Sequence, residues 1–235
     1  MRYVTEVSEV IVINTLTNIF QSKMVQSKLM KTDELLRKYP IISDQVDIRE
    51  LRVILYELEK QLQAGVKGNV VELGCYVGTT SLFVRRVLSA YGFTGEFHVY
   101  DSFAGLPPKT NEDQSVAGDQ FVTGELLAPR KTFVENFKKA GLKLPYIHKG
   151  WFNELAPDDI PDNVFFAFFD GDYYASIKDS FRAVAPKLAD NAVVIVDDYA
   201  SEALPGAAKA TDEWARVNAV TVRPQASLGI LHMGS

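Results

Sequence analysis

The segment Val70–Ser81 reads V-V-E-L-G-C-Y-V-G-T-T-S, and it changes from an apolar strand into the start of a helix. Gly74 and Gly78 lie between the two parts and allow the backbone to approach a ligand closely. The N-terminus of the following helix then points at whatever lies above the sheet. The pattern predicts a doubly wound α/β fold with a nucleotide-type site at the carboxyl end of the strand, with a plain tight turn as the alternative.

The chemistry of this loop favours a cationic nucleotide over a dinucleotide. A dinucleotide fingerprint has the spacing G-x-G-x-x-G, whereas this loop reads E-L-G-C-Y-V-G. Glu72 would repel a diphosphate, and it suits a ligand that carries an amino group. A nicotinamide-dependent oxidoreductase, which shares this kind of sheet, is therefore an alternative that lacks its diphosphate loop. The combination resembles motif I of the class I S-adenosylmethionine (SAM) methyltransferases.

The composition is that of a globular protein without a nucleic-acid partner. The chain has 235 residues, 47% of them hydrophobic, and a formal net charge of −5. These values suit one α/β domain with an N-terminal extension and a full core. The charges are mixed and form no basic stripe, which argues against nucleic acid. The single cysteine, Cys75, cannot form an internal disulfide and is expected to pack within the glycine loop.

The N-terminal residues show no signal for export or membrane insertion. Glu6 and Glu9 stand where a signal peptide has basic residues, and no small-residue cleavage site follows. The apolar segment Val10–Phe20 is interrupted by polar residues and is too short to span a bilayer. We therefore expect a cytoplasmic protein with no membrane partner, and the apolar segment suggests a homodimer.

Residues 1–65 lack strand alternation and are expected to form a helical cap before a methyltransferase-like domain at 66–235. Met24–Arg37 and Asp47–Leu62 both place apolar residues at helical spacing, and Pro40 separates them. A lid over the substrate, a dimer surface and packing against the sheet edge are all open functions for this cap.

From Gly68 onward, short apolar runs alternate with helical segments, which is typical of βαβ units and a parallel sheet. The loop Ser102–Asp119 exceeds ordinary βα connections and is expected to be functional. Strands are predicted at Val70–Leu73, Phe97–Tyr100, Tyr146–His148, Val164–Phe169, Ala192–Val196, Ala219–Val222 and Leu228–His232. Helices are predicted through Leu82–Val87 and at Lys131–Ala140, Ser176–Leu188 and Gly206–Val217.

Acidic residues fall at the ends of predicted strands. Asp101 follows the second strand, Asp170 follows the fourth, and Asp197 and Asp198 follow the fifth. Because parallel strands end at the same edge of a sheet, these carboxylates are expected to converge beside the glycine loop. Asp101 stands where the acid of a Rossmann-like sheet meets ribose hydroxyls, with a loop-capping aspartate as the alternative.

The other carboxylates predict a cation site. Asp170, Asp197 and Asp198 would repel one another, so a cation or protons must offset their charge. Oxygen ligands of this kind suit Mg²⁺, and helix capping is the alternative for the Asp197–Asp198 pair. Zinc is disfavoured, because the chain has one cysteine and its histidines have no ligand spacing. All three histidines are expected to have structural roles: His98, His148 and His232.

Further segments carry family-like patterns. They read V-Y-D-S-F-A-G-L-P-P at Val99–Pro108, F-F-D-G-D-Y-Y-A-S-I-K-D-S at Phe168–Ser180 and V-I-V-D-D-Y at Val194–Tyr199. With the glycine loop, they resemble the macrocin-type (TylF-like) O-methyltransferases of antibiotic biosynthesis, which include enzymes that methylate sugars of macrolides and of novobiocin. The resemblance covers about Lys67 to Trp214. The chain departs from the family at C-Y-V-G, where V-W-R-G is more usual, and in the tryptophan of K-G-W-F.

This resemblance implies a Rossmann-like class I methyltransferase fold that uses SAM and Mg²⁺, with a central, mostly parallel seven-stranded sheet flanked by helices. Carried onto this chain, the metal ligands are Asp170, Asp197 and Asp198, and Asp170 is also the general base. Glu72 is expected near the methionine amino group of SAM, Asp101 at the ribose and Trp151 beside adenine. The full set of expected cofactor contacts is Glu72, Gly74, Cys75, Gly78, Thr79, Thr80, Ser81, Asp101, Ser102, Gly150, Trp151 and Asp170.

The expected acceptor is a hydroxyl of a small molecule, either a sugar or another natural product. A phenol or catechol is the alternative within O-methyltransferases. Tyr173 and Tyr199 flank the metal acids and are candidates to contact an acceptor ring, with packing as the other reading. A non-catalytic binding domain and a metal-free enzyme that methylates nitrogen or carbon remain open as competing classes.

Overall fold

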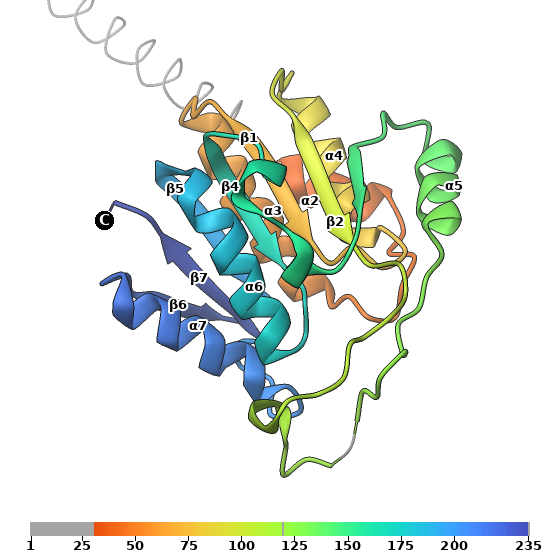
Figure 1. The fold of residues 1–235 in the computed structure, drawn as a ribbon. Coiled ribbons are helices and arrows are strands. Elements are labelled where there is room, and N and C mark those ends of the chain that lie inside the picture. The colour runs from red at the N-terminus through yellow and green to blue at the C-terminus, as the bar shows by residue number, and fades with distance from the viewer. Residues whose placement is uncertain (1–30, 119, 235) are drawn as a thin grey trace, which may run out of the picture. The chain divides into compact units, whose positions relative to one another are not determined.

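The computed structural model describes residues 31–118 and 120–234, and their core is a seven-stranded sheet in the order β3-β2-β1-β4-β5-β7-β6 (Figure 1). The strands β1 to β5 pair in parallel, whereas β7 runs antiparallel to both of its neighbours. The predicted mostly parallel sheet is therefore confirmed. The strands are β1 (Asn69–Leu73), β2 (Phe97–Asp101), β3 (Tyr146–Lys149), β4 (Val164–Phe169), β5 (Leu188–Val196), β6 (Val222–Gln225) and β7 (Leu228–His232).

Helices cover both faces of this sheet, because side chains alternate along each buried strand. Val70 and Phe168 belong to one hydrophobic cluster, and their neighbours Val71 and Phe169 belong to the other. The first cluster includes residues of α2 (Lys31–Lys38), α3 (Ile48–Gln63), α4 (Thr79–Ala90) and α5 (Arg130–Ala140). The second includes residues of α6 (Tyr174–Val184) and α7 (Pro205–Val217). Short 3₁₀ turns lie at Asn111–Asp113, Phe152–Glu154, Pro157–Asp159 and Ala185–Lys187.

The described part of the predicted helical cap packs on the sheet. The α3 helix begins after Asp47, whose carboxylate accepts a hydrogen bond from the Arg49 backbone N–H at 2.6 Å. Leu51, Leu55 and Leu58 are fully buried and join the same cluster as the sheet. The apolar segment Val10–Phe20, on which the dimer expectation rests, lies outside the described residues.

Three boundaries differ from prediction for local reasons. The β5 strand begins at Leu188, ahead of the predicted Ala192, because Leu188 pairs with Val164. The α6 helix ends before Pro186, which has no N–H to continue it. The prediction for the sixth strand was wrong by three residues: Ala219 has a φ of 55° after the end of α7, so the strand begins only at Val222.

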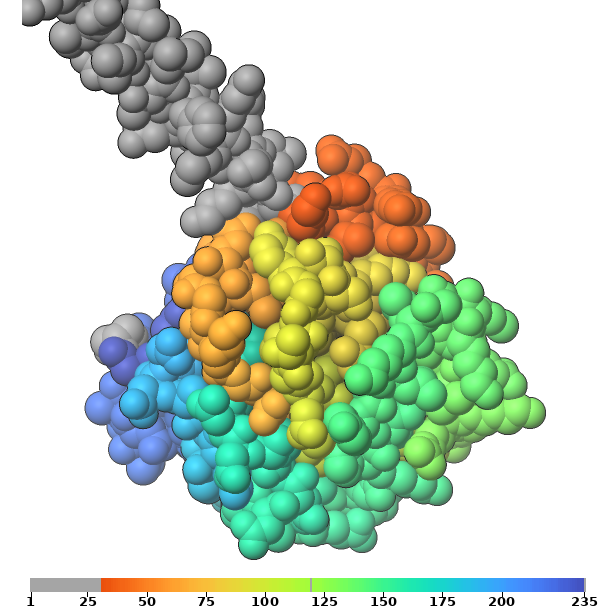
Figure 2. Space-filling model, turned by 90° about the horizontal axis from the view of Figure 1, so that it is seen from above, coloured from red at the N-terminus to blue at the C-terminus, as the bar shows by residue number. Residues whose placement is uncertain are grey.

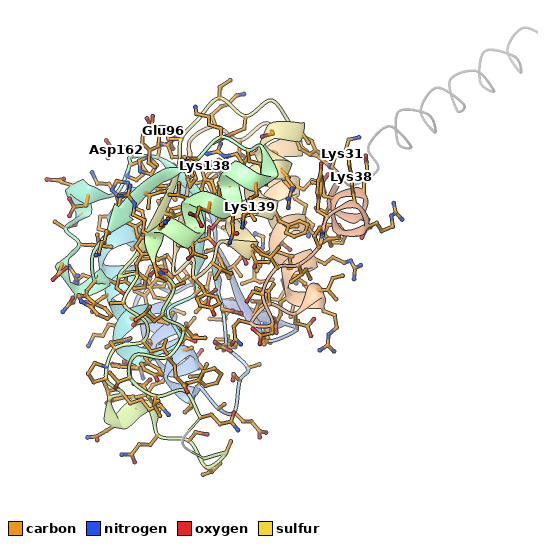
Figure 3. The ribbon with its side chains drawn as sticks, turned by 90° about the vertical axis from the view of Figure 1, so that its right-hand side faces the viewer. Lys31, Lys38, Glu96, Lys138, Lys139 and Asp162 are labelled. Atoms are coloured by element: carbon orange, nitrogen blue, oxygen red, sulfur yellow. The ribbon has the colours of Figure 1, made fainter. Side chains whose placement is uncertain are left out.

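The Asn69 side chain links the segments that precede β2 and β4 at the amino-terminal edge of the sheet. The Asn69 amide accepts a hydrogen bond from the Glu96 backbone N–H (2.9 Å) and donates one to the Asp162 carbonyl (2.8 Å). Glu96 and Asp162 lie close together in Figure 3, which agrees with this bridge. Seen from above in Figure 2, the yellow segment of α4 and β2 lies between the orange segment of α3 and the green segment that includes α5. None of the helices in residues 31–118 and 120–234 is long and apolar enough to cross a membrane.

Candidate active site

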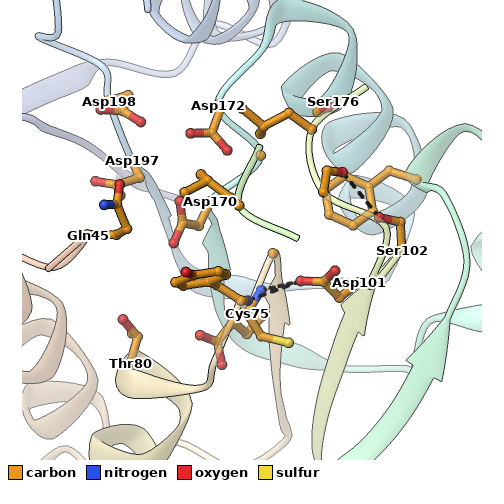
Figure 4. A pocket seen from close by; sticks show the side chains of 18 of the residues that line it. Gln45, Cys75, Thr80, Asp101, Ser102, Asp170, Asp172, Ser176, Asp197 and Asp198 are labelled. Atoms are coloured by element: carbon orange, nitrogen blue, oxygen red, sulfur yellow. Dashed lines mark hydrogen bonds between the residues drawn. The ribbon is translucent and has the colours of Figure 1, made fainter. Parts of the chain in front are cut away.

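A pocket lies at the carboxyl ends of the parallel strands (Figure 4), with an empty volume of about 1120 Å³ that includes space open to solvent. This is the place where open α/β sheets bind ligands. Most of the predicted site residues line it, and Gly78 and Ser81 do not. The predicted residues that line it are Glu72, Gly74, Cys75, Thr79, Thr80, Asp101, Ser102, Gly150, Trp151, Asp170, Asp197 and Asp198.

The two glycines of the loop are required by close packing. Gly74 has a φ of +91°, and a Cβ there would lie 1.8 Å from the Asp170 backbone carbonyl oxygen. Gly78 has a φ of +90° at the start of α4, and a Cβ there would lie 2.8 Å from the Phe133 ring. Gly74 therefore lets β1 and β4 end side by side at the pocket, while Gly78 seats α4 against α5.

Glu72 brings an unpaired carboxylate oxygen to the pocket wall. Its side chain is almost fully buried, and the Ser81 hydroxyl donates a hydrogen bond of 2.6 Å to Oε2. The other oxygen, Oε1, is buried and has no hydrogen-bond partner among the described residues. Burial raises the pKa of Glu72 to about 8. Ser81 thus orients the carboxylate from behind, and Oε1 is ready to accept a bond from a donor in the pocket.

Asp101 holds the loop that surrounds the ligand space. Its Oδ2 accepts hydrogen bonds from the backbone N–H groups of Cys75 (2.8 Å) and Tyr76 (3.1 Å). Its Oδ1 accepts one from the Phe103 N–H at 2.7 Å. The loop-capping role is therefore present in the structure. Each carboxylate oxygen can accept two bonds, so Oδ1 keeps capacity for a ribose hydroxyl as well.

Ser102, Gly150 and Trp151 form a neighbouring part of the wall. The Gly150 N–H bonds to the Asp101 carbonyl at 3.1 Å, which joins the ends of β2 and β3. The Ser102 hydroxyl accepts a bond from the Ala104 N–H at 3.1 Å, which stabilises the turn after β2. Trp151 remains 36% exposed and lines the pocket, so its ring is accessible to a planar ligand.

Asp170, Asp197 and Asp198 come together as the strand ends predicted. One carboxylate oxygen from each lies within 4.8 Å of the others, and this is the only such cluster in residues 31–118 and 120–234. Desolvation and then the charge of Asp197 raise the pKa of Asp170 well above its ordinary range. Desolvation and then the charge of Asp198 do the same for Asp197. Repulsion of this kind is relieved by a bound cation.

Sequence reasoning missed a fourth carboxylate at this edge. Asp172 lines the pocket, and desolvation followed by the charge of Asp198 raises its pKa to about 8. Asp172 and Asp198 both have left-handed backbone conformations, with φ values of 61° and 56°. Such strain in residues other than glycine persists only where the surroundings enforce it, and it gathers at functional sites. The second aspartate of D-G-D was a signal for Asp172 that the strand-end argument did not use.

Two further walls of the pocket come from segments far apart in sequence. Ser43, Gln45 and Glu50 approach from the start of α3 and the loop before it. Figure 4 shows Gln45 on the same side as Asp197 and Asp198. The long loop after β2 contributes a mainly apolar wall: Gly105, Leu106, Pro107, Phe121 and Leu126.

The comparisons with known proteins identify the family. A family model described as macrocin O-methyltransferase (TylF) matches residues 19–225. The chain belongs to this family. The curated 8-demethyl-8-(2,3-dimethoxy-alpha-L-rhamnosyl)-tetracenomycin-C 4′-O-methyltransferase of Streptomyces olivaceus is 32% identical over 174 residues, which are 71% of this chain and 67% of the relative. Mycinamicin III 3″-O-methyltransferase of Micromonospora griseorubida is 26% identical over 75% of this chain and 72% of its own.

A solved structure shows the same fold. The O-methyltransferase NovP superposes with a TM-score of 0.71 at 23% identity and covers 88% of this chain and 89% of its own. The predicted family and fold class are confirmed. As a member of the macrocin O-methyltransferase family, the chain is a SAM-dependent O-methyltransferase. The unpaired, buried Oε1 of Glu72 fits SAM, because the methionine end of that cofactor carries a cationic amino group.

The remaining candidates of this macrocin-type site are structural. The Tyr173 side chain is fully buried, and its hydroxyl donates to the Phe121 carbonyl at 2.7 Å. The Tyr199 hydroxyl donates to Asp212 at 2.8 Å, and neither tyrosine lines the pocket. Packing is thus the role that both tyrosines have.

His98 and His148 pack against each other, as predicted. His98 Nδ1 lies 3.0 Å from His148 Nε2, and the two rings stack at 5.2 Å on the outer strands of the sheet. His232 lies 3.7 Å from Glu57. Cys75 is buried and lines the pocket, and burial raises the pKa of its thiol well above the ordinary range, so it is a poor nucleophile.

Asp113 anchors the apolar wall of the pocket to the turn that carries the aspartates. Its side chain is fully buried, although it lies on the long loop. Its Oδ1 accepts a bond of 2.7 Å from the Tyr174 N–H at the start of α6, and its Oδ2 accepts two from Thr110. A negative charge is favourable at a helix N-terminus. The loop and the Asp170–Asp172 turn are therefore held together.

Proposed function

We propose that this macrocin-type enzyme is Mg²⁺-dependent and methylates a hydroxyl of a sugar or another natural product. The observation that carries the proposal is the cluster of Asp170, Asp197 and Asp198, which faces the same pocket as Glu72 and Asp101. An all-carboxylate donor set with raised pKa values fits a hard divalent cation. The relatives named above, which act on rhamnosyl-tetracenomycin and on mycinamicin III, support the acceptor class.

The cofactor is assigned to the glycine-loop side of the pocket. Glu72 binds the amino group through Oε1, and Asp101 binds the ribose through Oδ1 while it keeps its loop bonds. Thr79 supports this end, since its hydroxyl is buried without a hydrogen-bond partner among the described residues. Trp151 stacks on adenine at the other end. Asp170 lines the same pocket, so a cofactor held in this way would share the pocket with the assigned base.

In the reaction, the acceptor oxygen attacks the methyl carbon as the carbon–sulfur bond breaks. The products are a methyl ether and S-adenosylhomocysteine (SAH), and the hydroxyl proton passes to a carboxylate. A divalent cation held by Asp170, Asp197 and Asp198 would supply a Lewis acid that lowers the pKa of the hydroxyl. Asp170 is the assigned base, since it lines the pocket that would hold the acceptor and could take a proton there. Asp172 lies on the same turn and also lines the pocket.

The test begins with metal-stripped protein. SAH is titrated calorimetrically with and without Mg²⁺, and methyl transfer is then assayed against rhamnosyl glycosides, free hexoses and catechols. The proposal expects Mg²⁺-dependent turnover of the glycosides, with little turnover in Asp170→Asn. Undiminished turnover in EDTA would overturn the metal assignment. A preference for catechols would overturn the acceptor class, and full activity in Asp170→Asn with loss in Asp172→Asn would move the base to Asp172.

A further inference from the structure

Glu50 brings a carboxylate to the pocket from outside the catalytic strands. It lies in the first turn of α3, and it lines the same pocket as Asp197 and Asp198. It is not one of the three residues that form the carboxylate cluster. The neighbouring cation Arg49 forms its ion pair with Asp47 at 2.7 Å. The negative charge of Glu50 is thus added to a wall that already carries four aspartates.

A chain of hydrogen bonds holds Glu50 beside the metal-site loop. The Ser227 hydroxyl, in the turn between β6 and β7, donates to Glu50 Oε1. The Ser227 carbonyl accepts a bond of 2.9 Å from the Ala200 N–H. Ala200 is two residues after Asp198, so one serine connects the start of α3 with the loop that carries the Asp197–Asp198 pair. The hydrogen bond from Ser227 engages only one of the two carboxylate oxygens of Glu50, Oε1.

The charge of Glu50 shares one pocket with the cluster. Glu50, Asp197 and Asp198 all line this pocket. Ser227 bonds both to Glu50 and to Ala200, which directly follows the Asp197–Asp198 pair and Tyr199. A carboxylate that repels the cluster when no cation is present attracts a cation to it by the same Coulomb interaction.

We propose that Glu50 strengthens divalent-cation binding by the Asp170–Asp197–Asp198 cluster, as a carboxylate that lies beside the ligands without being one of them. The proposal rests on the Mg²⁺ site proposed above. Residues that support metal ligands without binding the metal typically change its affinity by about 10- to 100-fold. Glu50 belongs to α3, so a helix from the N-terminal part of the chain would also affect the affinity of the metal site.

The test measures cation binding without any acceptor. Mn²⁺ is titrated into the full-length, metal-stripped protein, and free Mn²⁺ is followed by electron paramagnetic resonance. Glu50→Gln removes the charge but keeps an oxygen that accepts from Ser227, and we expect Mn²⁺ affinity about tenfold lower. Ser227→Ala releases the carboxylate without removing it, and we expect a smaller loss. Asp44→Asn is the matched control, since it removes one charge from the same segment outside the pocket lining.

The outcomes separate this proposal from the metal assignment beneath it. Unchanged Mn²⁺ affinity in Glu50→Gln, with binding abolished in Asp197→Ala, would overturn the role of Glu50 alone. An equal loss in Asp44→Asn would also overturn it, because the effect would then be one of net charge. If the unmodified protein bound no Mn²⁺, the metal site and the inference would both fall. SAH affinity checks that each variant is folded, because Glu50 lies on the metal side of the pocket.

Discussion

Asp101 and the Asp170–Asp197–Asp198 cluster lie at the same edge of the sheet, but their surroundings are opposite. Asp101 accepts three backbone hydrogen bonds, and these bonds determine the path of the loops around it. One carboxylate oxygen from each of the three clustered aspartates lies within 4.8 Å of the others, and desolvation followed by the charge of a neighbouring aspartate raises the pKa of Asp170 and of Asp197. A carboxylate with its bonds made is part of the framework. A carboxylate left in repulsion marks the place where a ligand is needed.

Glu72 stands between these two cases. Ser81 satisfies one of its oxygens, while the other is buried without a partner among the described residues. One oxygen of Glu72 therefore stabilises the fold, and the other is available to a ligand. We therefore expect substitutions of Asp101 to lower mainly the stability of the fold and substitutions in the cluster to lower mainly ligand binding. Substitutions of Glu72 should affect both.

Asp197→Ala should have the largest effect on activity. Loss of a ligand removes the Lewis acid, which is worth several kcal/mol, so we expect methyl transfer to fall about 10³-fold. The ligand-free protein should become more stable, since a repelling charge is gone. Turnover assays with Mg²⁺ and thermal unfolding in EDTA measure both effects. If Asp197→Ala lowered stability as much as a substitution at Asp101, the contrast between framework and ligand carboxylates would be wrong.

Glu72 should make the ligand-free protein less stable as pH rises. Its pKa is about 8 in the folded protein and near 4.5 when unfolded, so the folded state binds the extra proton between these values. Stability therefore falls as pH rises through this window, by about 4 kcal/mol for this group. Glu72→Gln should flatten the dependence, as measured by denaturant unfolding from pH 5 to pH 8. An unchanged slope would show that Glu72 is ionised in the folded protein.

Asp101→Ala should destabilise the protein by about 3 kcal/mol, because it leaves backbone N–H groups without an acceptor. SAH affinity should fall along with stability, since the loop carries the cofactor wall. Asp101→Asn is the matched control: it keeps one oxygen acceptor and should recover part of the stability. Chemical denaturation and calorimetry measure the two quantities. If Asp101→Ala were as stable as the unmodified protein, the structural role assigned to Asp101 would be wrong.

Trp151→Ala should have the smallest effect. Trp151 is 36% exposed, so stability should be almost unchanged. Stacking on adenine is worth about 1 kcal/mol, which corresponds to roughly fivefold weaker SAH binding. Trp151→Phe should keep most of the affinity. Calorimetry decides the matter, and equal SAH affinity in all three proteins would place adenine elsewhere.

Local sequence determined the strand-end half of the site. Asp101, Asp170, the Asp197–Asp198 pair and part of the Val70–Ser81 loop all line the pocket, because each lies at the end of an apolar strand. Parallel strands leave little freedom in where their ends lie, so strand prediction is also prediction of the site. The same rule predicted nothing about residues that reach the pocket from elsewhere.

Only the tertiary structure decided the rest of the pocket. Glu50 reaches it because α3 packs on the sheet and Ser227, 177 residues later, holds its carboxylate. Tyr173 is fully buried outside the pocket lining, with its hydroxyl bonded to the Phe121 carbonyl, and buried Asp113 reaches the start of α6 across 61 residues of chain. The sequence determines which side chains stand at the strand ends, and the parallel sheet brings those ends to one edge. Long-range packing decides which distant side chains complete the site, because no local pattern records those contacts.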